Sequence, residues 1–162
     1  MNSKELFVRD TTVMKKSDNL FTVEVSENWS IGNTANGGYS MTLAAKAMSE
    51  FLEHKDPLSI SAHYLDRVDF GATELHLTHL SSSKSLSTAR VELIQNNKIK
   101  IIFIGTFTDF SFKNDMNIYE RDVPSFPDYE SCEVIPYKEG FNPKLDKNIE
   151  KAYSLRFFVV EK

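Results

Sequence analysis

The residues best suited to chemistry are Asn36, Gly37, Gly38 and Tyr39, which stand at the start of a long helical pattern. Two glycines at such a point let the backbone approach a ligand, and they leave N–H groups at the positive end of the helix dipole. These N–H groups can hold the developing oxyanion of a thioester or the phosphate of a nucleotide. A structural interpretation also fits, in which Asn36 caps the helix and the glycines only make the turn.

Metal and nucleophile chemistry find little support in the other reactive side chains. His76 and His79 would lie on opposite faces of a strand and cannot bind one ion together, and there is no Cys-x-x-Cys or His-Glu-x-x-His pattern. We therefore expect no metal. The sequence has no Gly-x-Ser-x-Gly pattern, and its single cysteine, Cys132, falls in a Pro-rich stretch without a nearby histidine. We expect neither a serine nor a cysteine nucleophile.

The positions of apolar residues predict strands on both sides of one long helix. Apolar residues at spacings of three and four predict a helix over residues 38–53, with its buried side formed by Met41, Ala44, Ala45, Met48, Phe51 and Leu52. Pro57 ends this helix because proline disfavours helical geometry at the preceding residue. Alternating or continuous apolar runs predict six strands, at residues 11–15, 20–25, 58–68, 73–80, 86–95 and 99–110.

This order of elements predicts an α+β fold, with one long helix on a curved antiparallel sheet of five or six strands. The strand at 99–110 is apolar on both faces, so we expect it in the middle of the sheet. One helix cannot cover such a sheet completely. We therefore expect a homodimer or higher homo-oligomer, with the sheets joined edge to edge.

Composition limits the classes of partner. The 162 residues carry a net charge of −4, with 41% hydrophobic and 26% charged residues. An acidic chain without a cluster of basic residues argues against nucleic acid or an anionic membrane as the main partner. The longest apolar stretch, Ile101–Ile104, is too short to span a bilayer, and the first ten residues lack a secretory signal. With one cysteine, we expect a reducing, cytoplasmic setting.

The chain divides near residue 111. We expect a compact domain at residues 1–110 and a connector at 111–147 that contains four of the five prolines. The aromatic and aliphatic residues at 148–162 indicate a terminal strand, similar to the opening strand of a second unit.

Several short motifs, taken in order, resemble the hotdog-fold acyl-CoA thioesterases, and most closely the N-terminal unit of the acyl-CoA thioesterase II-like proteins. The resemblance runs from about residue 21 to residue 110 and rests on the Asn-Gly-Gly-Tyr helix start, Asp56–Leu65, Gly71 and Leu86–Val91. It implies a helix wrapped in a curved sheet, with active sites between two such units. It also implies hydrolysis of a fatty acyl-CoA to free acid and CoA, with no cofactor besides the CoA of the substrate.

The resemblance further implies roles for individual residues. The predicted catalytic residues are Gly37 and Gly38, whose N–H groups would hold the oxyanion, and Asn36, which would orient the water or the carbonyl. The predicted substrate-binding residues are Tyr39, His63, Tyr64 and Arg90. A structural interpretation also stands for the last three, with His63 a hydrogen-bonded strand residue, Tyr64 in the core, and Arg90 paired with Glu92 or Glu74.

One position departs from the family pattern. Many proteins of this fold carry an Asp or Glu on the helix as general base, whereas this chain has Ala45 there. In the thioesterase II-like branch the catalytic carboxylate belongs to a second unit. The alternative function is therefore a non-catalytic acyl-CoA-binding or structural hotdog unit. A dehydratase of the same fold is less well supported, because neither the helix nor the loop before it contains a histidine.

Overall fold

The computed structural model describes residues 3–112, 125 and 128. The terminal strand expected at 148–162 lies outside the described residues, as does nearly all of the connector expected at 111–147.

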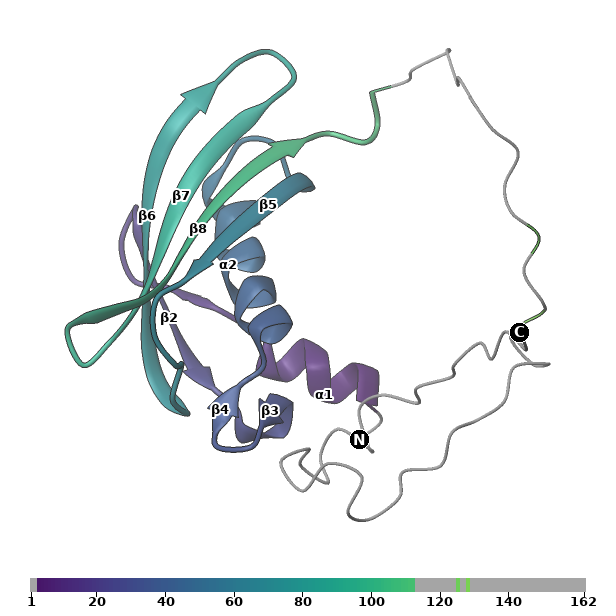
Figure 1. Ribbon diagram of the computed structural model, residues 1–162. Helices are drawn as coiled ribbons and strands as arrows, with labels where there is room; N and C mark the ends of the chain where they lie inside the picture. The colour runs from purple at the N-terminus through teal and green to yellow at the C-terminus, as the bar shows by residue number, and fades with distance from the viewer. Residues whose placement is uncertain (1–2, 113–124, 126–127, 129–162) are drawn as a thin grey trace.

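A six-stranded antiparallel sheet forms the larger layer of the described part, and the long helix α2 lies against one of its faces (Figure 1). This arrangement confirms the predicted α+β class. The strand order is β1-β2-β6-β7-β8-β5. The strands are β1 (Met14–Lys15), β2 (Leu20–Val25), β5 (Asp56–Tyr64), β6 (Gly71–Ser82), β7 (Ser87–Gln95) and β8 (Lys98–Thr108).

Helix α2 spans Gly37–Phe51, close to the range that the periodicity predicts, and Ala44, Met48 and Leu52 of its predicted buried side are buried. Met41, Ala45 and Phe51 are only half-buried. The fully or nearly fully buried residues are Tyr39, Ser40, Leu43, Ala44, Ala47 and Met48. They pack on the sheet face that carries Leu75, Leu77, Val91, Leu93 and Phe103.

Helix α2 packs tightly on the sheet at Gly105 of β8. A Cβ atom at this position would overlap the Sδ atom of Met48 and would lie 3.2 Å from the ring of Phe107. Both of these side chains are 0% exposed. Glycine at position 105 is therefore what lets Met48 fit between helix and sheet.

The segment before α2 is more structured than its sequence predicts. It begins with a helix, α1 (Ser3–Asp10), which the periodicity does not reveal, and the strand expected at 11–15 shrinks to Met14–Lys15. After β2 come a 3-10 turn, η1 (Glu27–Trp29), and a small hairpin of β3 (Ser30–Ile31) and β4 (Thr34–Ala35). Figure 1 shows α1 and this hairpin beside the N-terminal end of α2.

The two edges of the sheet differ in length. β8 lies between β7 and β5, which confirms its predicted place inside the sheet. β5 is a nine-residue edge strand, and it ends at Tyr64 because the N–H groups of Leu65 and Asp66 both donate to the carbonyl of Lys100. The opposite edge, β1, has two residues. Within the described residues, no helix is long and apolar enough to cross a membrane.

Candidate active site

Asn36 caps helix α2 with its side chain. Its Oδ1 atom accepts hydrogen bonds from the N–H groups of Gly38 at 2.8 Å and Tyr39 at 3.3 Å. These two donors fix the side-chain amide, so that Oδ1 faces the helix and Nδ2 faces away from it. The structural interpretation of Asn36 as a helix cap is confirmed, and it leaves the Nδ2 group available for a second role.

Gly37 presents its backbone at the same turn. No hydrogen bond of its N–H group is found within the described residues, while its carbonyl accepts one from the Tyr64 hydroxyl at 3.1 Å. A Cβ atom on Gly37 would lie 3.0 Å from the Tyr64 ring. Tyr64 is 55% exposed at the end of β5, so it is not a core residue. The free donor at the turn is therefore the N–H group of Gly37, because the cap occupies that of Gly38.

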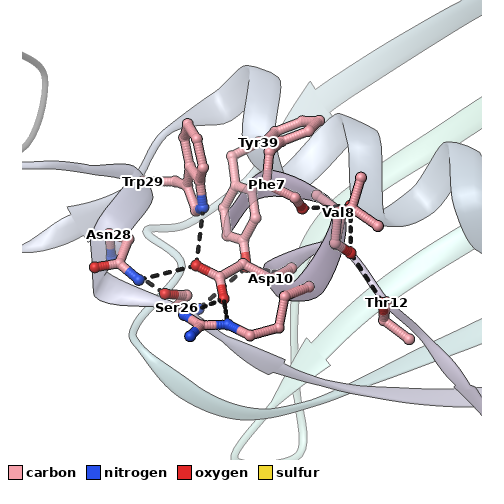
Figure 2. Close-up of polar contacts among 10 residues, drawn as sticks. Phe7, Val8, Asp10, Thr12, Ser26, Asn28, Trp29 and Tyr39 are labelled. Atoms are coloured by element: carbon pink, nitrogen blue, oxygen red, sulfur yellow. Dashed lines mark hydrogen bonds and ion pairs between the residues drawn. The ribbon is translucent and has the colours of Figure 1, made fainter. Parts of the chain in front are cut away.

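Tyr39 follows the turn but points into the protein. Its ring is 2% exposed, and its hydroxyl donates to the backbone carbonyl of Asp10 at 2.7 Å (Figure 2). The same hydroxyl accepts a hydrogen bond from the N–H group of Ser26 at 3.1 Å. Burial raises the pKa of the Tyr39 phenol, against the lowering effect of the Ser26 hydrogen bond. The structure thus places the Tyr39 hydroxyl in a buried network rather than at the surface of the turn.

His63 and Arg90 lie on the other face of the sheet. Side chains alternate along a strand, and Ala62, Ala89 and Val91 face the core that α2 covers. His63 and Arg90 therefore face away from α2, and Arg90 forms an ion pair with Glu92, as its structural interpretation expects. Of the seven predicted site residues, the structure brings Asn36, Gly37, Gly38 and Tyr64 together at one surface. The sheet separates His63 and Arg90 from them.

Carboxylates are scarce around the turn. Ala45 stands half-buried in the middle of α2, and Glu50, the first acidic residue of this helix, is exposed near its far end. Asp10, at the end of α1, is a buried carboxylate residue linked to the first turn of α2, because its backbone carbonyl accepts a hydrogen bond from the Tyr39 hydroxyl. No motif in the sequence identifies it, since its partners Trp29 and Tyr39 lie 19 and 29 residues away in the chain.

Asp10 is an ionised, fully bonded carboxylate. It is 8% exposed, and burial opposes its ionisation. Hydrogen bonds from Arg9, Asn28, Ser26 and Trp29 outweigh this effect and hold the pKa of the Asp10 carboxyl below its usual value. A carboxylate stabilised in this way is a poor proton acceptor, so Asp10 does not replace the missing general base.

The part of the chain that the structure describes offers no metal site at the turn. Among the described residues, no group of three or more His, Cys, Asp or Glu side chains could hold an ion. A hollow of about 390 Å³ lies elsewhere, along β2 and β6, and its lining includes Met14, Thr22, Glu24 and Glu74 but no residue of the turn.

Comparison with known sequences gives one family. The sequence model described as the acyl-CoA thioesterase N-terminal domain matches residues 25–109, more than half of the chain. No curated protein matches the chain. The matched range contains α2 and the strands β5 to β8, and it excludes α1.

Solved structures share the fold at low sequence identity. A candidate thioesterase II from Thermobifida fusca has a TM-score of 0.72 at 20% identity, over 89% of this chain and 53% of that protein. A protein with a hot dog fold from Alicyclobacillus acidocaldarius has a TM-score of 0.72 at 12% identity, over 83% and 50%. An acyl-CoA thioesterase II from Mycobacterium marinum has a TM-score of 0.63 at 14% identity, over 79% and 47%. The chain thus spans about half the length of these structures.

Proposed function

The chain belongs to the acyl-CoA thioesterase N-terminal domain family and has the hotdog fold, and from this premise we propose that it binds a fatty acyl-CoA and takes part in hydrolysing it to free acid and CoA. The observation that carries the proposal is the accessible turn at Asn36–Gly38, inside the residues that the family model matches. The reaction needs no cofactor, because the CoA is part of the substrate. We expect it to occur in the cytoplasm, as a step of lipid metabolism.

Two donors at this turn suit the transition state of thioester hydrolysis. When water attacks the carbonyl carbon, the carbonyl oxygen gains negative charge before the CoA thiolate leaves. The Gly37 N–H group and the Asn36 Nδ2–H group can donate to this oxygen, and neither has to give up a bond to do so. Donors fixed in advance are effective because they need no reorganisation during the reaction. Gly38 supports them indirectly, by holding Oδ1 of Asn36.

A second unit is required to complete the site. Water must lose a proton as it attacks, and Ala45 offers no base for it. We propose that two chains pair along the free edge of β5, next to Tyr64, so that the partner supplies the base and the two units enclose the acyl chain between them. The nine-residue length of β5 and the 58% exposure of Leu58 support this pairing.

A pair of matched substitutions, one at Asn36 and one at Asn33, tests the catalytic role. Asn36→Asp keeps an oxygen for the helix cap and removes the Nδ2 donor, so we expect the protein to stay folded and the release of CoA thiol to fall by a factor of about 10²–10³. The matched control is Asn33→Asp, which makes the same chemical change at an exposed position of the β3–β4 hairpin and should leave the rate within about twofold. An unchanged rate in Asn36→Asp would show that Nδ2 does not contribute to catalysis.

The second candidate function is binding of acyl-CoA without turnover, and the absence of a helix carboxylate at Ala45 favours it. Calorimetry with a non-hydrolysable acyl-CoA thioether separates the two functions. Binding of the thioether together with thiol release from acyl-CoA supports the thioesterase. Binding without thiol release, over several acyl chain lengths, supports the binding unit.

A further inference from the structure

Helix α1 lies outside the residues that the family model matches, yet it ends against the candidate site. Its last residue, Asp10, carries a carboxylate whose side chain is 5% exposed. Figure 2 shows this carboxylate between Asn28, Trp29 and the ring of Tyr39.

The carboxylate of Asp10 gathers donors from two segments of the chain. Its Oδ1 atom accepts from Nε of Arg9 at 2.7 Å. Its Oδ2 atom accepts from Nδ2 of Asn28 at 2.9 Å and from Nε1 of Trp29 at 3.1 Å. Since a neutral amide at this position would turn one N–H group toward other donors, only an ionised carboxylate satisfies all of these groups together.

A first route leads from Asp10 to Asn36 through Trp29. The indole of Trp29 is fixed by Asp10 on its nitrogen and by the edge of the Phe7 ring, whose centroid lies 4.8 Å away. The backbone carbonyl of the same Trp29 accepts the N–H group of Asn36 at 2.8 Å. A shift of η1 would therefore move the main chain of Asn36.

A second route leads from Asp10 to the Asn36 side chain through Tyr39. The backbone carbonyl of Asp10 accepts the Tyr39 hydroxyl at 2.7 Å, and the ring of Tyr39 stacks on Trp29 at a centroid distance of 6.2 Å. The N–H group of Tyr39 is one of the two donors that hold Oδ1 of Asn36. The backbone N–H group and the side-chain oxygen of Asn36 are thus both connected to Asp10 through hydrogen-bonded residues.

We propose that Asp10 is a positioning residue that sets the geometry of the Asn36–Gly38 turn from outside the residues that the family model matches. Its charge holds η1 on one side of the turn, and its carbonyl holds Tyr39 on the other. The consequence for catalysis rests on the proposed function, whereas the effect on the geometry of the turn does not. In this proposal α1 helps to position the candidate site through Asp10.

The test uses the full chain with Asp10→Asn, Tyr39→Phe and a control, Asp56→Asn. The Asp56 carboxylate also accepts a backbone N–H group, that of Phe110 at 2.8 Å, but at the opposite end of β5 from Tyr64. In ¹⁵N-labelled protein, we expect the amide signals of Gly37 and Gly38 to move in Asp10→Asn and in Tyr39→Phe. They should stay in place in Asp56→Asn, and Gly105 on β8 serves as the internal reference. Unmoved Gly37 and Gly38 signals in the first two variants would overturn the proposal.

Thiol release supplies the second readout. We expect kcat to fall about tenfold in Asp10→Asn, with a smaller change of KM, because the turn acts on the transition state. In a protein that already carries Asn36→Ala, Asp10→Asn should lower kcat by less than about twofold, because the effect of Asp10 on catalysis passes through Asn36. A full tenfold loss in that background would show that Asp10 acts by another route.

The two readouts separate the two proposals. If wild-type protein releases no thiol while the glycine signals respond to Asp10→Asn, the positioning role stands and the thioesterase proposal fails. If Asp10→Asn does not fold, Tyr39→Phe decides the matter alone, since it removes one hydroxyl and keeps the buried ring. An unchanged turn in that variant overturns the proposal.

Discussion

At the scale of single residues, the candidate site is built from backbone groups and one amide. Asn36 has two tasks, because its oxygen caps the helix while its nitrogen faces away. These two roles of the Asn36 side chain explain why an Asn-Gly-Gly sequence suits the turn before α2. Each glycine leaves the approach to the turn open, and an amide provides an acceptor and a donor within one side chain.

The sequence reveals this turn because its partners are neighbours in the chain. Asn36, Gly38 and Tyr39 lie within four positions of one another, so a local motif is sufficient to predict the cap. Tyr64 and Asp10 are different, since they reach the turn only through the fold. The sequence also does not determine that His63 and Arg90 lie on the sheet face opposite the turn. Alternation shows which side chains of a strand share a face, but not which face the helix covers.

The pKa of Asp10 gives a prediction at this scale. Its folded pKa lies below the value of about 3.9 that is usual for an unfolded chain, so its stabilising effect is complete above that pH. The effect is lost as the pH falls through the folded pKa. We expect Asp10→Asn to lower the free energy of unfolding by about 1–3 kcal/mol at pH 7, because buried donors lose a charged acceptor.

Urea unfolding of both proteins at pH 7, 4 and 2.5 measures this difference. The other carboxylates titrate alike in wild type and variant, so their contribution cancels. The gap between the two stabilities should shrink from pH 4 downward. A gap that stays constant to pH 2.5 would mean that the charge of Asp10 does not stabilise the fold.

At the scale of elements, periodicity predicts β2 at its observed bounds, places β5 at 58–68 instead of Asp56–Tyr64, and misses α1 and the β3–β4 hairpin. The sequence predicts α2 and strands β6, β7 and β8 to within about two residues at most ends, because each has enough apolar positions to show its period. α1 has eight residues and two partly buried apolar ones, Leu6 and Phe7. A helix so short is marginal alone and depends on tertiary contacts such as those of Asp10.

The packing of α2 on the sheet predicts an effect of a single methyl group. Gly105→Ala would place a Cβ atom against Met48 and Phe107, which are both fully buried. We expect the free energy of unfolding to fall by about 1–3 kcal/mol, the usual cost of overpacking a core. Denaturant unfolding, followed by circular dichroism, measures it.

Gly37→Ala is the matched control for this substitution. It also creates a close contact, 3.0 Å from the Tyr64 ring, but Tyr64 is 55% exposed and can turn into solvent. Alanine is also the better helix former, so we expect stability within about 1 kcal/mol of wild type. An equal decrease in the free energy of unfolding in the two variants would show that α2 is not packed more tightly against Gly105 than against Tyr64 at its N-terminal end.

At the scale of the whole molecule, the sheet has one long open edge and one short edge. β5 offers nine residues for pairing, whereas β1 offers two, one of which is Lys15. Short strands and lysines are typical of edges that resist pairing. If two chains pair through β5 as proposed, neither keeps a second long open edge, so we expect the assembly to close at two copies.

Light scattering on wild type and Leu58→Lys tests this pairing. We expect wild type to have twice the chain mass of 18.5 kDa, and the variant to shift toward the monomer, because a charge would enter the paired edge. The matched control is Leu80→Lys, at a residue of similar exposure (50% against 58%) outside β5, which should leave the dimer intact. A wild-type monomer would contradict the pairing and, with it, the shared active site.

The hairpin turn between β7 and β8 has a consequence for the order in which the chain folds. Asn96 and Asn97 adopt left-handed conformations (φ 51° and 58°), which match the twist of a two-residue hairpin. β7 and β8 thus meet by closing a very short loop, whereas β5 can join β8 only after the chain between them has closed a much longer one. We expect the β7–β8 hairpin to form early and β5 to join late. Tyr64 would then reach its place, and the hydrogen bond from its hydroxyl to the Gly37 carbonyl would form, among the last parts of the fold.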